Sequence, residues 1–205
     1  MKLDPFYLVV DNAEWIARLV PLGVRLVQLR MKNMSEADMR RDIAAAKQVC
    51  GDHGCQLILN DYWRLAIEEG CDYIHLGQED LAGADVSAIR AAGIRVGVST
   101  HDSRELKAAL AVQPNYVALG PVYETRLKKM PWRPQGCDRI RDWKQRIGDI
   151  PLVAIGGLDP SRLHGVFDAG ADIAAVVTDI VTNDNPQART LEWIRTTRRW
   201  AKKTL

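Results

Sequence analysis

The chain has 205 residues, a length that suits one compact domain with a sizeable core. Its 28 Lys and Arg residues are balanced by 26 Asp and Glu residues, so the net charge of +2 gives no reason to expect nucleic acid or a membrane surface as a partner. The sequence shows neither a signal-peptide pattern nor an apolar run near the roughly 18 residues of a membrane helix. Its four cysteines form no CxxC pair and no zinc-type cluster with the four histidines, which favours reduced thiols in a cytoplasmic protein.

Short apolar runs alternate with amphipathic segments along the whole chain. Polar residues or glycines follow the runs, as is typical of buried parallel strands. The runs are Phe6–Val10, Leu26–Leu29, Gln56–Leu59, Tyr73–Leu76, Arg95–Val98, Tyr116–Leu119, Leu152–Ile155 and Ile173–Val177. Eight strands alternating with about eight helices predict a single (β/α)8 TIM barrel, one catalytic domain over residues 1–205 with parallel strands and outer helices. The alternative is an open doubly wound sheet, but its dinucleotide-binding form would carry GxGxxG after the first strand, and this chain does not.

Capping residues mark several helix boundaries. Ser35, with Asp38 three residues later, predicts a helix that runs to about Cys50. Asp102 predicts a helix over Ser103–Ala111. The remaining expected signals are a helix start at Asp159-Pro160, helix stops at Gly70, Gly93 and Gly170, and a last helix over Pro186–Lys203.

The second predicted strand carries alternating residue types. Gln28, Arg30 and Lys32 share one face, and the intervening residues Val27, Leu29 and Met31 share the other. If helices cover the sheet, two cations and an amide on an inner face need an anionic partner. Arg offers a bidentate fork and Lys a point charge, so the pattern favours a phosphorylated ligand. An edge strand with a solvated polar face is the alternative.

Polar groups also follow most of the other predicted strands. The groups are Asn60-Asp61, His75 with Gly77–Asp80, Ser99–His101, Gly120-Pro121 with a loop carrying Thr125, Arg126, Lys128, Lys129 and Arg133, Gly156-Gly157, and Val177–Asp179. In a barrel the ends of parallel strands share one rim, where catalytic residues gather. We therefore expect these groups to meet in one active site.

Six motifs in this order resemble the thiamine-phosphate synthase family over nearly the whole chain. They are Val27–Lys32, Leu59–Asp61, His75–Asp80, Gly97–His101, Gly120–Thr125 and Ala154–Gly157. The resemblance implies a barrel transferase of thiamine biosynthesis. It would join hydroxymethylpyrimidine diphosphate to hydroxyethylthiazole phosphate with Mg²⁺ as cofactor, releasing pyrophosphate by a dissociative route in which the thiazole nitrogen attacks. The implied partners are these small-molecule substrates, and the oligomeric state stays open.

The same resemblance implies that Asp61 and Asp80 are the ligands of Mg²⁺, which prefers oxygen donors and binds one or two carboxylates plus substrate phosphates. Each aspartate has a simpler alternative. Asp61 could cap a helix over Tyr62–Glu69, and Asp80 could be a solvated loop acid beside Glu79.

Substrate contacts are implied in the same way. Ser99, Lys128 and Arg30 are the implied catalytic residues, and the implied substrate-binding set is Gln28, Arg30, Lys32, Asn60, Ser99, Thr125, Lys128, Gly157, Val177 and Thr178. The last three would hold the thiazole phosphate through backbone N–H groups and a hydroxyl. The alternatives are a helix-start hydroxyl at Ser99, a solvated cation at Lys128 and a tight turn at Gly156-Gly157. His75 and His101 could each contact the substrate, and the alternative for each is a structural role.

The loop after the sixth strand departs from the family pattern. Glu124 stands where the family has proline, and Leu127 replaces a hydroxyl residue, which puts one phosphate contact in doubt. The loop runs about 17 residues, and we expect it to be a lid over the diphosphate. The rival functions are a thiazole tautomerase, which needs no Mg²⁺, a non-catalytic thiazole or thiamine phosphate-binding barrel, and a sugar-phosphate isomerase or epimerase.

Overall fold

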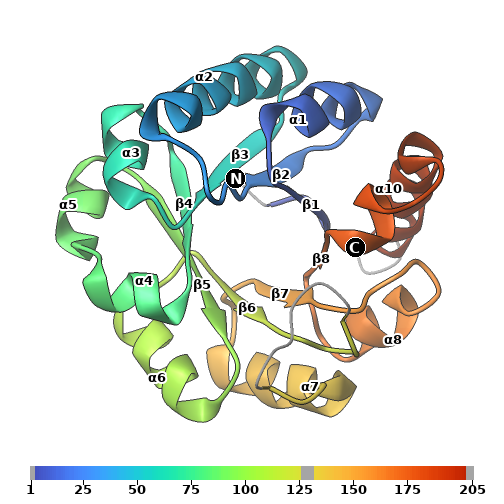
Figure 1. The fold of residues 1–205 in the computed structure, drawn as a ribbon. Coiled ribbons are helices and arrows are strands. Elements are labelled where there is room, and N and C mark those ends of the chain that lie inside the picture. Colours follow the sequence, from blue (N-terminus) through green and yellow to red (C-terminus); the bar gives the residue numbers. More distant parts are fainter. Residues whose placement is uncertain (1–2, 126–131, 202–205) are drawn as a thin grey trace.

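The strands form one closed barrel with a parallel ladder between every pair of neighbours. The computed structural model describes residues 3–125 and 132–201. In chain order the strands are β1 (Phe6–Val10), β2 (Leu26–Leu29), β3 (Gln56–Asn60), β4 (Tyr73–Leu76), β5 (Arg95–Thr100), β6 (Tyr116–Leu119), β7 (Leu152–Ile155) and β8 (Ile173–Val176). Figure 1 looks along the barrel axis and shows the helices as an outer ring. The predicted (β/α)8 barrel is therefore confirmed.

Helices connect the strands and cover the outside of the barrel. They are α1 (Ala13–Leu19), the 3-10 helix η1 (Val20–Leu22), α2 (Glu36–His53), α3 (Trp63–Glu68), α4 (Gln78–Gly83), α5 (Val86–Ala91), α6 (Ser103–Ala111), α7 (Gly136–Ile147), α8 (Leu163–Asp168), α9 (Thr178–Val181) and α10 (Pro186–Ala201). In the described residues three connections carry an additional short helix, because η1 follows α1 after β1, α4 and α5 both follow β4, and α9 precedes α10 after β8.

The predicted helix signals are mostly confirmed. Ser35 caps α2 by accepting a hydrogen bond from the Asp38 backbone N–H at 3.2 Å, and Asp102 caps α6. The prediction of a helix start at Asp159-Pro160 is wrong. The Asp159 carboxylate accepts hydrogen bonds from the backbone N–H groups of Ser161 and Arg162, which makes a turn, and α8 begins only after it.

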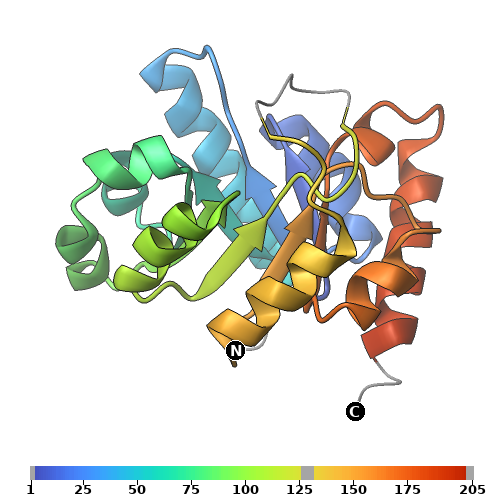
Figure 2. The same ribbon diagram turned by 90° about the horizontal axis from the view of Figure 1, so that it is seen from below.

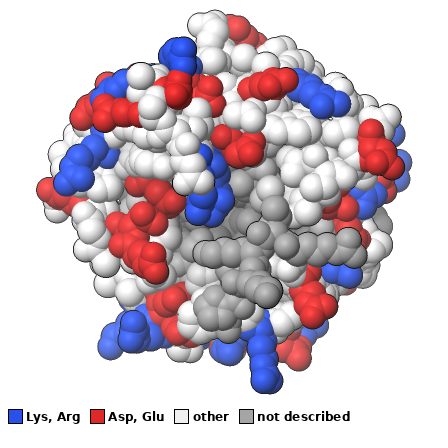
Figure 3. Space-filling view, viewed as in Figure 1, with Lys and Arg blue, Asp and Glu red and all other residues white. Residues whose placement is uncertain are grey.

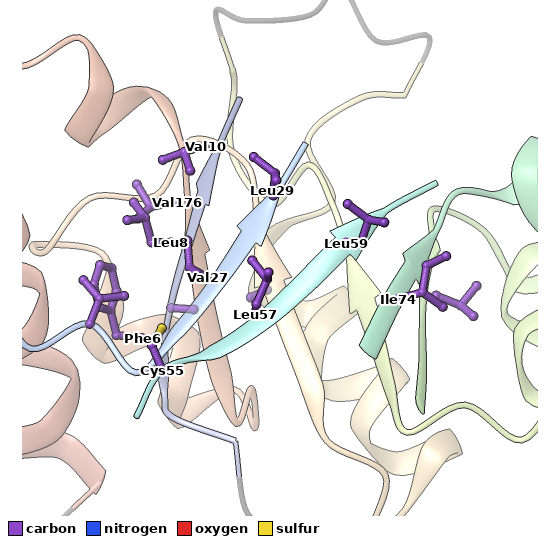
Figure 4. Packing of buried hydrophobic residues seen from close by; sticks show 14 of the residues in the cluster. Phe6, Leu8, Val10, Val27, Leu29, Cys55, Leu57, Leu59, Ile74 and Val176 are labelled. Carbon is purple, nitrogen blue, oxygen red and sulfur yellow. The ribbon is translucent and has the colours of Figure 1, made fainter. Parts of the chain in front are cut away.

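The core consists of two layers separated by the strands. The outer layer packs strand residues against helices, and Figure 4 shows Leu8, Val27 and Leu57 in it. The inner layer fills the barrel with Tyr7, Val9, Leu26, Ile58, Tyr73, Tyr116, Ala118, Val153, Ile173 and Ala175. Alternate residues of each strand therefore serve different layers.

This alternation confirms the two faces predicted for the second strand as far as Leu29, where β2 ends, and Arg30, Met31 and Lys32 follow the strand. Val27, Leu29 and Met31 belong to the outer layer, whereas the Gln28 amide reaches an inner tyrosine. The strands point upward in Figure 2, so the segments that follow them lie together at the top. Within the described residues, no helix is long and apolar enough to cross a membrane.

Candidate active site

A cleft opens at the strand-end rim between the ends of β2, β3 and β4. It has a volume of about 270 Å³ and is lined by Met31, Lys32, Asn33, Asp61, Tyr62 and Asp80. Figure 3, viewed onto this end, shows acidic and basic groups side by side on the α2–α4 side of the barrel axis. The cleft thus brings together one predicted cation and both predicted metal ligands.

The backbone directs the Asp61 carboxyl group into this cleft. Asp61 has φ 66°, an uncommon left-handed conformation for a residue other than glycine, and its N–H donates to the His75 carbonyl at 2.9 Å. The Gly77 N–H and the Asn60 amide both donate to its carboxylate. Tyr62, not Asp61, occupies the N-cap position of α3, so the helix-cap alternative is wrong.

The carboxyl groups of Asp61 and Asp80 contact each other. Burial and the Asp80 charge raise the pKa of Asp61 to about 6, although the Gly77 N–H and the nearby Arg30 oppose the rise. Two carboxylates held together without a cation between them repel each other, and a divalent cation would relieve this repulsion. The described residues contain no cluster of three or more His, Cys, Asp or Glu side chains suited to a metal. Two carboxylates in an open cleft fit Mg²⁺, which completes its shell with water and substrate phosphates.

Cations lie beside this pair. Arg30 follows β2, is half-buried, and is close enough to lower the pKa values of both Asp61 and His75. Lys32 lines the cleft and is exposed. Among the described side chains, neither Arg30 nor Lys32 makes a hydrogen bond or ion pair, so both are available to an anion.

Ser99 and His75 meet further inside the barrel. The His75 Nε2 atom lies 2.7 Å from the Ser99 Oγ atom, and its Nδ1 atom lies 2.7 Å from the Tyr116 hydroxyl. Burial and the nearby Arg30 lower the pKa of His75 to about 4, so its imidazole is neutral at pH 7. Ser99 lies within β5 and Asp102 caps the following helix, so Ser99 is not a helix-start hydroxyl.

His101 has a different environment. Its Nδ1 atom pairs with the Glu105 carboxylate at 2.7 Å, and its ring stacks on Trp132 with a centroid distance of 5.3 Å. Its carbonyl accepts a hydrogen bond from the Gln135 amide at 3.0 Å. His101 therefore joins the start of α6 to the segment that leads into α7, which is a structural role.

The opposite side of the rim relies on backbone. Gly156 and Gly157 have φ 100° and 65°, and the Tyr123 N–H donates to the Gly156 carbonyl at 3.0 Å. A Cβ on Gly157 would overlap the Glu124 carbonyl and lie 2.8 Å from the Tyr123 Cβ atom. The glycines thus allow the loops after β6 and β7 to touch, so they form more than a simple turn.

The remaining predicted residues are distributed around the same rim. Val177 is the N-cap residue of α9, and Thr178 is the first residue of that helix. Thr125 is half-buried at the end of the described part of the β6–α7 connection. Arg126, Leu127, Lys128 and Lys129 lie outside the described residues, and so does the central part of the predicted lid.

Two inner tyrosines were not predicted as part of the site. The Tyr7 hydroxyl lies 3.1 Å from the Tyr116 hydroxyl and accepts a hydrogen bond from the Gln28 amide at 2.8 Å. The sequence carried a signal for them, since a tyrosine inside a fully buried strand needs a partner for its hydroxyl.

The strand-end rim of this closed (β/α)8 barrel carries two carboxylates in contact, two cations that pair with no described side chain, and a glycine-rich loop pair. Such a rim is typical of enzymes that act on phosphorylated small molecules. Comparison with known proteins identifies the family. The family model described as "Thiamine monophosphate synthase" matches residues 6–180. The chain belongs to this family, and the predicted enzyme class, a thiamine-phosphate synthase, is confirmed.

Individual relatives agree with this assignment. The chain is 60% identical over 200 residues to the thiamine-phosphate synthase of Rhizobium etli, an alignment that covers 98% of both proteins. It is 49% identical over 174 residues to that of Cronobacter sakazakii, covering 85% of this chain and 83% of the relative. The solved thiamine phosphate pyrophosphorylase of Pyrococcus furiosus superposes with a TM-score of 0.84 over 95% of both chains at 22% identity, which supports the fold.

Proposed function

We propose that the chain condenses 4-amino-5-hydroxymethyl-2-methylpyrimidine diphosphate with hydroxyethylthiazole phosphate, giving thiamine phosphate and pyrophosphate. The observation that carries this proposal is the contact between the Asp61 and Asp80 carboxyl groups in a cleft shared with Lys32. A carboxylate pair beside cations that pair with no described side chain suits a ligand that brings both a metal ion and several negative charges, as a diphosphate does.

Asp61 and Asp80 would hold Mg²⁺. When bound, this ion would neutralise charge on the diphosphate oxygens and help pyrophosphate to depart. Asn60 donates to the Asp61 carboxylate and so orients it, which gives Asn60 an indirect role in substrate binding.

Arg30 and Lys32 would bind the diphosphate directly, and Arg30 would stabilise the charge that grows on the leaving group. Ser99 would donate its hydroxyl proton in a hydrogen bond to a pyrophosphate oxygen. Gln28 is buried, with 5% of its surface exposed, so we propose that it borders the pyrimidine end of the site. The pyrimidine ring can stabilise the cation left by pyrophosphate, and the thiazole nitrogen then attacks that carbon.

The thiazole phosphate would bind between the loops that follow β7 and β8. Gly157 lets the loop after β7 pack against the loop after β6, and Val177 and Thr178 begin a short helix whose N–H groups would face the phosphate. Thr125 would contact the thiazole side of the site. The contact of Lys128 with the diphosphate, the lid, the single-domain boundaries and the cytoplasmic location stay predictions.

The thiazole tautomerase is the rival with a specific feature in its favour, because Glu124-Thr125 resembles its motif. That reaction needs no metal, and it would leave the contact between Asp61 and Asp80 without a purpose. The synthase therefore accounts for more of the site.

Incubation with both substrates tests the proposal. We expect thiamine phosphate and pyrophosphate in equal amounts with Mg²⁺ and neither product in excess EDTA. Absence of product from fresh substrates would contradict the proposed function. Turnover that persists in EDTA would contradict the metal role of Asp61 and Asp80, and isomerisation of a thiazole phosphate without pyrophosphate release would favour the tautomerase.

A further inference from the structure

A chain of hydrogen bonds crosses the inside of the barrel from β2 to β5. The Gln28 amide donates to the Tyr7 hydroxyl at 2.8 Å, and this hydroxyl lies 3.1 Å from that of Tyr116. The Tyr116 hydroxyl lies 2.7 Å from His75 Nδ1, and His75 Nε2 lies 2.7 Å from the Ser99 Oγ atom. Every neighbour is within hydrogen-bonding distance, and five strand residues contribute.

The amide donor at the Gln28 end of this hydrogen-bond network determines which group donates and which accepts in every bond. An amide nitrogen can only donate, so the Tyr7 oxygen accepts from Gln28. In the described residues Tyr116 is the only other partner of the Tyr7 hydroxyl, so the Tyr7 proton points to Tyr116. Tyr7 and Tyr116 are 2% and 0% exposed. If Tyr116 instead donated to Tyr7, the Tyr7 proton would be buried without an acceptor, which is costly.

The same rule then applies at each following step. Tyr116 accepts from Tyr7 and donates to His75 Nδ1, which therefore carries no proton. An imidazole without a proton on Nδ1 holds its proton on Nε2, so His75 donates it to the Ser99 oxygen. The Ser99 oxygen is an acceptor in this bond, and no other described residue makes a hydrogen bond with its hydroxyl, so its own proton is available to a ligand at the rim.

We propose that His75 and Tyr116, kept in one orientation by Tyr7 and Gln28, are positioning residues that make Ser99 a hydrogen-bond donor toward the departing pyrophosphate. This inference rests on the proposed function for the identity of the ligand. The buried network fixes the direction of the Ser99 hydroxyl before the substrate binds. Such preorganisation favours the transition state, where charge on the leaving group is largest.

Gly97 shows that the barrel makes room for this network. The Tyr116 ring packs against Gly97 of the neighbouring strand, and a Cβ at that position would overlap the ring. The ring also stacks on His75 at an interplanar angle of 12° and a centroid distance of 5.6 Å. The position of the Tyr116 hydroxyl is therefore fixed by packing as well as by hydrogen bonds.

The tautomer of His75 tests the inference on the full chain without substrates. Nitrogen-15 NMR distinguishes a protonated from an unprotonated ring nitrogen, and the signal missing from His75→Gln identifies the residue. We expect the proton on Nε2. A proton on Nδ1 would overturn the inference, because Ser99 would then give its own proton to His75. This result does not depend on the reaction, so it separates failure of the inference from failure of the proposed function.

Kinetics tests the consequence for catalysis. Tyr116→Phe removes both hydrogen bonds of the Tyr116 hydroxyl, and only the bond to His75 leads to Ser99. Loss of that one bond of ordinary strength predicts that kcat falls about fivefold and that KM for the pyrimidine diphosphate stays within about twofold. Tyr73→Phe is the matched control. The Tyr73 ring lies 5.7 Å from that of Tyr116 in the same inner layer, but its hydroxyl makes no hydrogen bond to any described residue.

A double-mutant cycle separates positioning from a general effect on packing. If Tyr116 acts through Ser99, Tyr116→Phe should cost little further activity in a Ser99→Ala background. An equal loss in both backgrounds would overturn the inference, and so would an equal loss from Tyr73→Phe.

Discussion

The two sides of the rim differ in the chemical groups that they present to a ligand. On the β2–β4 side, Asp61, Asp80 and Lys32 line one cleft, Arg30 lies close to Asp61, and neither cation pairs with a described side chain. On the β7–β8 side, the Gly157 backbone packs against the loop after β6, and the Arg162 guanidinium donates to the Gly157 carbonyl.

This difference matches two tasks. Full charges that are close together but not mutually neutralised suit a step in which negative charge develops on a leaving group. Backbone groups at a glycine turn suit binding of a phosphate that stays unchanged through the reaction. We therefore expect changes on the first side to act mainly on turnover, and changes on the second side to act mainly on affinity.

Loss of either carboxylate should give the largest effect. We expect Asp61→Asn and Asp80→Asn each to lower kcat by about 100-fold or more, because the metal site and its charge compensation are lost. Affinity for hydroxyethylthiazole phosphate, measured by calorimetry, should change less than about threefold. Glu79→Gln is the matched control, since Glu79 is an exposed carboxylate directly before Asp80 and outside the cleft. Equal losses of turnover and of thiazole phosphate affinity would show that the two sides are not separate.

A methyl group at Gly157 should give the opposite pattern. Its Cβ would lie 2.8 Å from the Tyr123 Cβ atom at a φ of 65°, so the two loops must separate. We expect Gly157→Ala to raise KM for the thiazole phosphate about tenfold or more and to leave the Mg²⁺ concentration for half-maximal activity unchanged.

Gly148→Ala isolates the backbone strain. Gly148 has a similar φ of 61°, but nothing lies within 4 Å of the position where its Cβ would be. With ψ −122° Gly148 lies in a backbone region that other residues rarely adopt, so this variant should lower the free energy of unfolding by about 1–3 kcal/mol and leave both KM values intact. If Gly148→Ala raised KM for the thiazole phosphate as much as Gly157→Ala, the contact between the two loops would not be the cause of the effect.

The sequence predicted the strands better than the chemistry inside them. Short apolar runs located all eight strands, although β3 and β5 extend to Asn60 and Thr100, beyond the predicted ends. A polar residue does not end a strand when its side chain finds a partner, as the Thr100 hydroxyl does by donating to the Ala118 carbonyl at 2.9 Å.

Relations across the barrel were harder to predict. That Asp61 and Asp80 would share one rim followed from parallel strands, but their contact depends on the left-handed backbone of Asp61, which sequence spacing does not reveal. The link from Tyr7 to Tyr116 joins residues 109 positions apart through the barrel interior. The turn at Asp159 was mistaken for a helix start because the same side-chain acceptor serves both structures.

The pH dependence should belong to the β2–β4 side. The pKa of Asp61 is about 6 in the folded chain, above its ordinary value of 3.8, so the folded state binds more protons than the unfolded state between these values. This carboxyl group therefore makes the metal-free protein less stable as pH rises from about 4 to about 6.

Saturating Mg²⁺ should reverse this trend, because the ion binds the ionised carboxylates. Thermal unfolding from pH 4.5 to 7, with and without Mg²⁺, measures both effects. Asp61→Asn should lose both and should raise Tm in the absence of Mg²⁺ near pH 7. An unchanged pH profile in this variant would show that another group is responsible.

The smallest effect on activity is expected from the support of the β8 side. The Asp179 carboxylate accepts from the Arg189 Nε and Nη2 atoms at 2.7 and 2.9 Å and from the Trp193 indole at 2.7 Å. These bonds fix α9, whose first residue is Thr178, against α10. Asp179→Asn should lower the free energy of unfolding by about 1–3 kcal/mol, because a half-buried guanidinium loses a charged partner.

The effect of Asp179→Asn on the reaction should be confined to affinity. We expect KM for the thiazole phosphate to rise about two- to fivefold, because the loop that carries Thr178 is less well fixed, and kcat at saturation to stay constant. Asp172→Asn provides the control, since Asp172 pairs with Lys144 at 2.8 Å just before β8, at the opposite end of the barrel. Both variants should lose stability, but only Asp179→Asn should raise this KM. If kcat fell instead, α9 would contribute to the chemical step, and the division of the rim into a turnover side and an affinity side would be wrong.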